Sequence, residues 1–168
     1  YALLAFASVG VLVPFFFYNV FGNANRGHKI FMGDTGSLTL GFILSVMVVK
    51  YVSVMVQESS RLDGAPVVMA FSVLLVPSLD VCRVVLNRFR RRVHPFKPDK
   101  SHIHHKFLNM GFTPRRSMIL IQLMAVAFIV LTLVLLRIGL LAPVVFMLDI
   151  LVWTLMNVWF SRIISRRA

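Results

Sequence analysis

The chain reads Phe31-Met32-Gly33-Asp34-Thr35-Gly36-Ser37-Leu38 immediately before an apolar run that ends at Val56. A helix over this run is long enough to cross a bilayer, so Asp34 is placed where water ends and the membrane begins. If Gly36 and Ser37 open the helix, its first N–H groups favour an anion at the same place. A carboxylate beside free N–H donors suits a Mg²⁺–phosphate complex, while plain helix capping explains the same residue types.

The composition extends this interpretation to the whole chain of 168 residues, of which 58% are hydrophobic. The apolar residues come in continuous blocks rather than in alternation, which predicts membrane helices and argues against a β-barrel. We therefore expect an all-α polytopic transmembrane bundle, forming one membrane domain over residues 1–168. Five spans are predicted, at residues 2–18, 38–56, 65–81, 118–136 and 140–160.

The net charge of +12 is concentrated between the predicted spans. Loops 19–37 and 82–117 and the tail carry most of the basic residues, whereas the opposite side receives only Arg61 and Arg137. The positive-inside rule makes the basic side cytoplasmic, and Asp34 and the histidines with it. Because topology accounts for the charge, no nucleic-acid partner is expected.

The start of the second loop is predicted to be a basic amphipathic helix over residues 82–93. Apolar residues recur at helical spacing, and polar residues occupy the other side. The apolar set is Val81, Val84, Val85, Phe89 and Val93, and the polar set is Arg83, Asn87, Arg90 and Arg91. Anchoring on anionic headgroups and binding of an anionic lipid substrate explain this pattern equally well.

A histidine-rich motif follows, His102-Ile103-His104-His105, flanked by Lys100 and Lys106. Pro95 and Pro98 exclude regular helix up to residue 98. Neutral imidazoles bind metals and imidazolium binds phosphate, so the motif is compatible with a polar loop, a weak metal site or a phosphate site.

The residues 31–38 resemble a signature of the polyprenyl-phosphate N-acetylhexosamine-1-phosphate transferases. Residues 98–105, read as PDKSHIHH, resemble the PDxxHIHH loop of that family's WecA/TagO-type branch rather than the consecutive histidines of its MraY branch. Tyr18-Asn19 and the segment 77–80, PSLD, resemble two further family patterns. The resemblance covers the C-terminal half of the family. Its upstream DDxxD and NxxNxxD segments have no counterpart here, so we expect a fragment that is inactive alone.

The resemblance implies transfer of N-acetylhexosamine 1-phosphate, most plausibly GlcNAc 1-phosphate, from a UDP-sugar to undecaprenyl phosphate, with release of UMP. It implies a bacterial inner-membrane enzyme of lipid-linked sugar synthesis for cell wall or O-antigen, with a cytoplasmic active face, and is compatible with a homodimer. It implies Asp34 as ligand of Mg²⁺, or alternatively Mn²⁺. The implied catalytic residues are Asp34, His102, His104 and His105. The implied substrate-binding residues are Asn19, Phe31, Gly33, Lys100, Lys106, Arg90 and Arg91.

The rival interpretations are a non-catalytic membrane anchor and a transporter subunit with a metal-binding histidine loop. An anchor would not need both motifs. A transporter should carry polar residues in several spans, yet Asp149 and Lys50 are nearly alone there. Snorkelling explains Lys50. An acid such as Asp149 inside a span is functional by default and is expected to pair across helices, with a partner that the sequence does not identify.

Overall fold

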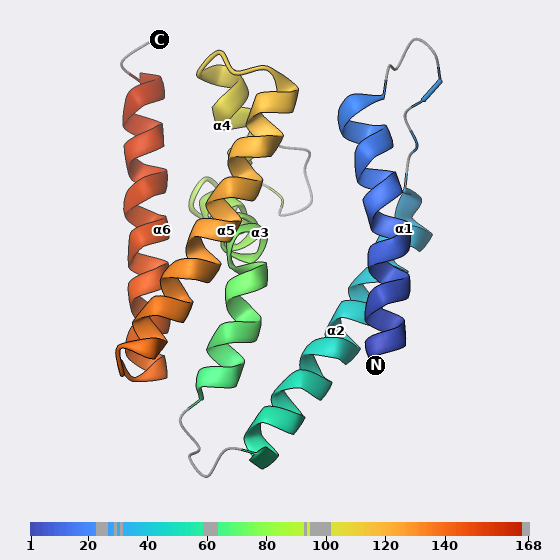
Figure 1. Ribbon diagram of the computed structural model, residues 1–168. Coiled ribbons are helices and arrows are strands. Elements are labelled where there is room, and N and C mark those ends of the chain that lie inside the picture. The colour runs from blue at the N-terminus through green and yellow to red at the C-terminus, as the bar shows by residue number, and fades with distance from the viewer. Residues whose placement is uncertain are drawn as a thin grey trace. The chain divides into compact units, whose positions relative to one another are not determined.

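The computed structural model describes residues 1–22, 27–28, 30, 32–58, 64–92, 94 and 102–165, and no strand occurs among them. It consists of two compact units, Tyr1–Ser60 and Arg61–Ala168. Figure 1 shows the described elements, which are all helices. The predicted all-α class is confirmed.

The first unit contains two long helices, α1 (Ala2–Phe21) and α2 (Gly33–Glu58). Pro14 lies inside α1, and the helix continues through it rather than breaking. Val20 is the only buried residue among those described in this unit. The two helices line an apolar crevice of about 540 Å³, to which Phe15 of α1 and Ile43 of α2 contribute. Apolar helices with so little buried surface suit a lipid environment rather than water.

The second unit packs three long helices, α3 (Ala65–Arg90), α5 (Pro114–Arg137) and α6 (Ala142–Ser165), against one another. The short helix α4 (Ile103–Asn109) packs on α5 and α6. The core has two clusters of buried residues. One consists of Leu75, Val76, Phe128 and Trp153, and the other of Val68, Ala142 and Val145.

Helix α3 is one continuous helix with Pro77 in its interior. In Figure 1 the first half of α3 runs upward in the plane of the picture and its second half is seen nearly end-on, so the helix changes direction in the middle. Proline removes one helical hydrogen bond and clashes with the preceding turn, which explains a bend there. Pro77 therefore accounts for the bend in α3.

The predicted basic helix is the last part of α3 up to Arg90, not a separate element. Its predicted apolar face is only partly buried. Val84 is buried, whereas Val81 and Phe89 are exposed, and Val93 lies outside the described residues. Asp80 and Val84, one turn apart, are the buried residues of this end of the helix, so a polar residue shares the buried face.

The described residues include five helices that are long and apolar enough to cross a membrane, namely α1, α2, α3, α5 and α6. They contain the five predicted spans, except that α6 begins two residues after the predicted start of the last one. The expected partner of Asp149 is Thr132 of α5, whose Oγ1 donates to Asp149 Oδ2 at 2.8 Å. Both residues are fully buried. This hydrogen bond joins α5 to α6 inside the predicted membrane region.

Candidate functional site

Asp34 lies in the first turn of α2, and this helix begins at Gly33 rather than at the predicted Gly36. Gly33 has φ +69°, a left-handed conformation that costs a residue with a side chain more than it costs glycine. Ser37 Oγ donates to the backbone carbonyl of Asp34 at 2.9 Å, so that hydrogen bond does not involve the carboxylate. The Asp34 side chain is exposed beside the N-terminal N–H groups of the helix, where an anion is favoured.

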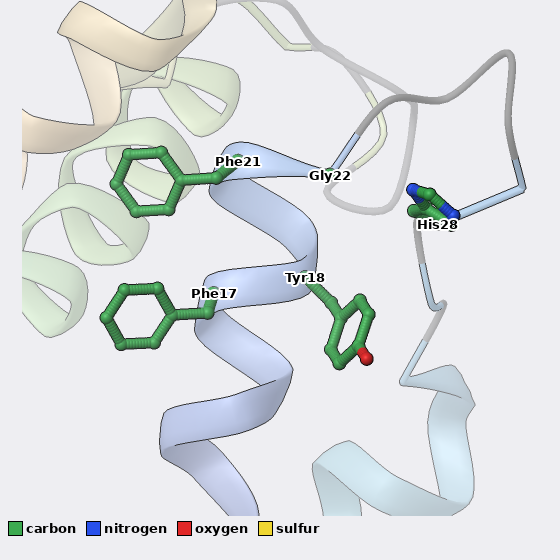
Figure 2. A pocket seen from close by; sticks show the side chains of 5 residues that line it. All are labelled: Phe17, Tyr18, Phe21, Gly22 and His28. Atoms are coloured by element: carbon green, nitrogen blue, oxygen red, sulfur yellow. The ribbon is translucent and has the colours of Figure 1, made fainter.

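The end of α1 carries Asn19 and an aromatic pocket. Asn19 Nδ2 donates to the Phe15 carbonyl at 3.0 Å, so its amide group is turned back onto its own helix. The pocket beside it has a volume of about 410 Å³ and is lined by Phe17, Tyr18, Phe21, Gly22 and His28. Figure 2 shows Phe17 and Phe21 pointing to one side of α1 and Tyr18 to the other. Phe31, the predicted substrate contact in the same unit, lies outside the described residues.

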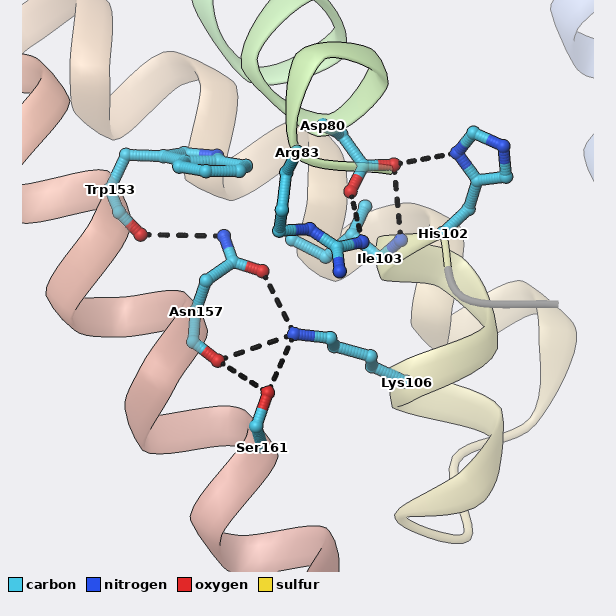
Figure 3. Close-up of polar contacts among 8 residues, drawn as sticks. All are labelled: Asp80, Arg83, His102, Ile103, Lys106, Trp153, Asn157 and Ser161. Atoms are coloured by element: carbon cyan, nitrogen blue, oxygen red, sulfur yellow. Dashed lines mark hydrogen bonds and ion pairs between the residues drawn. The ribbon is translucent and has the colours of Figure 1, made fainter. Parts of the chain in front are cut away.

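Asp80 of α3 is the centre of the polar network in the second unit (Figure 3). Asp80 as a whole is 6% exposed. Oδ1 accepts from Arg83 at 2.8 Å, and Oδ2 accepts from the backbone N–H of Ile103 at 3.1 Å. Oδ2 also lies 2.9 Å from Nδ1 of His102. A carboxylate only accepts, so this ring nitrogen carries the proton and the other ring nitrogen points away from Asp80.

This network fixes the start of α4. His102 is the N-cap residue of α4 and provides no capping side-chain bond, so the Asp80 carboxylate from α3 accepts from the first-turn N–H in its place. The apolar residues Ile103 and Phe107 are buried one turn apart. Phe107 meets Phe112 and Phe160 edge to face. A seven-residue helix is too short to be stable alone, so these tertiary contacts hold it.

His102, His104 and His105 therefore lie on α4 and its N-cap, in a short helix that the sequence did not predict. The rings of His102 and His104 are nearly parallel with centroids 6.0 Å apart, and those of His104 and His105 are 4.0 Å apart. Burial lowers the pKa of His104 below its ordinary value, and His105 and His102 lower it further. His104 is thus favoured as a neutral imidazole, which can donate one hydrogen bond without carrying charge.

Lys106 joins α4 to α6. Its Nζ donates to Asn157 Oδ1 at 3.1 Å, to the Asn157 carbonyl at 3.3 Å and to Ser161 Oγ at 2.9 Å. Burial and the nearby Arg83 lower the pKa of Lys106 to about 8. Lys106 is therefore charged at neutral pH, but its amine loses the proton at a lower pH than the amine of an exposed lysine does.

A groove runs beside this network, between α3, α4 and α6, with a volume of about 830 Å³. Arg90 and Lys106, both predicted substrate contacts, line it together with Arg83 and Arg162. Arg91, the C-cap residue of α3, is exposed and is not among the lining residues. Lys100 lies outside the described residues.

The positions of the potential ligand side chains show which kind of metal site the described residues could form. Within the described ranges, no three His, Cys, Asp or Glu side chains are placed to hold one metal ion. Mg²⁺ needs less from a protein, because one or two carboxylates with substrate phosphate and water complete its shell. The exposed carboxylate of Asp34 fits that mode as a single protein ligand.

Sequence reasoning did not assign Asp80, Asn157 or Ser161 to the site. For Asp80 a sequence feature was available, because this acidic residue follows an apolar run and lies three positions before Arg83, the spacing of an ion pair on a helix. Its partners on α4 lie 22 and 23 positions further along the chain, beyond the reach of local patterns. Asn157 and Ser161 lie one turn apart on a mainly apolar helix, a spacing that places them on one face but does not identify a partner.

Comparison with known proteins gives consistent matches. Residues 1–52 match the family described as "Glycosyl transferase family 4". An undecaprenyl-phosphate alpha-N-acetylglucosaminyl 1-phosphate transferase from Yersinia pestis is 32% identical over 126 residues, covering 74% of this chain and 32% of that protein. Its namesake from Escherichia coli K12 gives the same figures, and that from Pasteurella multocida is 29% identical over 74% of this chain and 33% of its own length.

The chain spans about a third of the length of the curated relatives it matches. No solved structure matches it. With its five apolar helices, it is a multi-pass membrane protein. These matches, together with the two sequence motifs, lead to one conclusion about ancestry: the chain belongs to glycosyl transferase family 4.

Proposed function

We propose that the protein takes part in transfer of N-acetylglucosamine 1-phosphate from UDP-N-acetylglucosamine to undecaprenyl phosphate at the cytoplasmic face of the bacterial inner membrane. In this reaction a phosphate oxygen of the lipid attacks the sugar-bearing phosphorus of the donor. The bond between that phosphorus and the bridging oxygen of the pyrophosphate breaks, and UMP leaves with the bridging oxygen. The relatives' names support the acceptor and the transferred sugar.

The observation that carries the proposal is the anchoring of α4 by Asp80. A buried carboxylate fixes both the helix start and the ring of His102, so His102, His104 and His105 are held in a defined arrangement. Phosphoryl transfer needs mainly positioning and neutralisation of phosphate charge, which preorganised donors supply. We assign these three histidines to hydrogen bonds with substrate phosphates.

The predicted substrate contacts Asn19, Gly33, Lys106, Arg90 and Arg91 remain part of this proposal. For Asn19, substrate contact through Nδ2 requires that the amide leave the Phe15 carbonyl. Gly33 contributes through the backbone at the start of α2. The three basic residues contribute positive charge, which attracts phosphate groups.

Asp34 is assigned to Mg²⁺. The ion would supply positive charge for the donor pyrophosphate when bound. Asp34 would contribute one carboxylate oxygen, and the neighbouring N–H groups at the start of α2 would favour the phosphate charge. Mn²⁺ is the alternative ion that the same ligand would accept.

The test is UMP release and lipid-linked product formation by the protein at its full natural length, in membranes with UDP-N-acetylglucosamine, undecaprenyl phosphate and Mg²⁺. His104→Ala and His105→Ala should each lower turnover at least about tenfold, as expected for loss of a positioned donor. His94→Ala is the matched control, because His94 lies outside α4, and it should keep near-normal turnover. Absence of product from the unaltered protein would refute the proposed reaction, and unchanged turnover in both α4 variants would refute the role of the histidines.

A further inference from the structure

The groove between α3, α4 and α6 has a lining that changes character along its length. On α6 the lining residues run from Ile150 and Trp153 through Asn157 and Ser161 to Arg162, so it passes from apolar to polar to charged. On α3, Leu79 and Leu86 add apolar surface, and Arg90 adds a charge. An elongated site with one apolar end and one cationic end is complementary to an amphiphile with an anionic head.

The charge of the groove is one-sided. Its lining includes four basic residues, Arg83, Arg90, Lys106 and Arg162, and no acid among the described lining residues. Asp80 pairs with Arg83 from outside the lining. Within the described part of the chain, Arg90 and Arg162 form no ion pair with a carboxylate. The groove therefore keeps an excess of positive charge that favours an anion.

The indole of Trp153 adds a second, independent indication. Trp153 is 5% exposed and lines the groove, yet its Nε1 has no hydrogen-bond partner among the described residues. A buried indole N–H without a partner is unfavourable, and buried tryptophans usually find one. In Figure 3 the indole extends from α6 toward Arg83 of α3, across the groove wall. Because Nε1 is itself buried, an ester or phosphate oxygen of a bound lipid would accept from this N–H only after the indole turns toward the groove.

The histidines do not take part in this groove. None of His102, His104 and His105 is among its lining residues, and Figure 3 shows His102 pointing away from Lys106, Asn157 and Ser161. An occupant of the groove would therefore not contact the three histidines, although it would contact Lys106 and Arg90, which the proposed function also gives to substrate phosphates. This separation favours a lipid that does not react over the acceptor lipid.

We propose that the groove binds one anionic glycerophospholipid of the surrounding membrane, with its phosphate at the end formed by Arg90, Lys106 and Arg162. The acyl chain lies against Leu79, Ile150 and Trp153. The bound lipid bridges α3, α4 and α6 and supports the position of α4. The site shares Arg90 and Lys106 with the proposed substrate contacts, but its test measures lipid binding and does not require the transferase reaction.

The test is native mass spectrometry of the purified protein in detergent, titrated separately with phosphatidylglycerol, phosphatidylcholine, undecaprenyl phosphate and inorganic phosphate. Phosphatidylglycerol should bind with one-to-one stoichiometry and more tightly than phosphatidylcholine. Arg162→Gln should weaken phosphatidylglycerol binding about fivefold, the usual contribution of one basic residue near an anionic lipid. Leu86→Ser, at an exposed apolar lining position, should also weaken it.

Two variants serve as controls, one for the charge at position 162 and one for the location of the arginine that is removed. Arg162→Lys keeps the charge and should bind nearly as the unaltered protein does. Arg115→Gln removes an exposed arginine outside the groove and should have no effect. Equal binding of the two glycerophospholipids, or indifference to Arg162→Gln, would overturn the site. Inorganic phosphate binding as tightly as phosphatidylglycerol would overturn the lipid assignment. If undecaprenyl phosphate displaced phosphatidylglycerol from the unaltered protein, and Arg162→Gln abolished this displacement, the groove would be an acceptor site instead.

Discussion

The two units of the chain differ in what holds their helices. Among the described residues of the first unit only Val20 is buried, whereas the second unit has two core clusters and a buried polar network. The family match covers residues 1–52, which lie in the first unit. The part of the chain that matches the family model is thus the part with the least internal packing.

The difference shows that recognisable motifs and tertiary structure carry separate information. In the first unit, Asp34 is placed by local structure alone, the start of α2 at a left-handed glycine. In the second unit, the histidines are placed by Asp80, which comes from another helix. Substitutions should therefore affect activity alone in the first unit and activity together with stability in the second.

The largest effect is expected from Asp34→Asn. If Asp34 is the Mg²⁺ ligand, turnover should fall at least about a thousandfold, since a lost metal charge costs several kcal/mol of transition-state stabilisation. The unfolding temperature in detergent should not change, because the side chain is exposed. Glu58→Gln, at the other end of α2, is the matched control for removal of a carboxylate from this helix. Turnover within a few-fold of normal in Asp34→Asn would remove Asp34 from the site.

Asp80→Asn should destabilise the second unit by about 3 kcal/mol, because Arg83 loses its ion pair and the N–H of Ile103 loses a charged acceptor. Thermal unfolding in detergent measures this loss, with Asp34→Asn as the same substitution in the first unit. Equal unfolding temperatures for the two variants would contradict the contrast between the units.

Thr132→Val tests the hydrogen bond inside the predicted membrane region. It leaves the Asp149 carboxyl group without its donor from α5 and should cost about 1 kcal/mol, as interhelical hydrogen bonds in membranes typically do. Thr154→Val is the control, since Thr154 is exposed and donates to the Ile150 carbonyl of its own helix. A larger loss in the control than in Thr132→Val would show that Asp149 does not depend on Thr132.

The smallest effect concerns Lys106 and pH. Its pKa is lowered from 10.5 to about 8, so between these values the unfolded chain binds more protons than the folded protein. Stability attributable to Lys106 should therefore rise with pH across this window and stay constant below it. Because the amine is only half buried and solvent screens its charge, the gain should be below about 1 kcal/mol. The unfolding temperature of the protein minus that of Lys106→Met, compared from pH 7 to 10.5, should increase as pH rises. A difference that does not vary with pH would contradict the lowered pKa.

The long helices could be predicted from sequence because each depends on the length of an apolar run, which a bilayer converts directly into a span. Helix α4 could not, since seven residues with a polar, histidine-rich face carry little helical signal. The sequence feature that could have indicated this helix is the pair of apolar residues Ile103 and Phe107, one turn apart. Such a pair predicts a helix only when the surface on which it packs is known. Asp149 was identified as paired, but its partner Thr132 depends on how α5 and α6 pack.

The candidate site divides in the same way. Asp34 and the histidines were found by motif, because their residue types and order are local properties of the chain. Asp80, Asn157 and Ser161 were missed as site residues because each acts through a contact between helices. Sequence therefore indicated which groups are present for chemistry, and the fold added which groups hold them.

Asp80 is proposed to hold the histidine helix α4 in place, and amide hydrogen exchange measures whether it does. Exchange of the backbone N–H groups of α4, Ile103 to Asn109, should be measured in the unaltered protein and in Asp80→Asn, with α2 as internal reference (Figure 3). The predicted result is clearly faster exchange throughout α4 in the variant and unchanged exchange in α2, because the cap of α4 is lost while the first unit is unaffected. Exchange in α4 at the same rate in both proteins would show that the helix stands without Asp80 and would contradict the account.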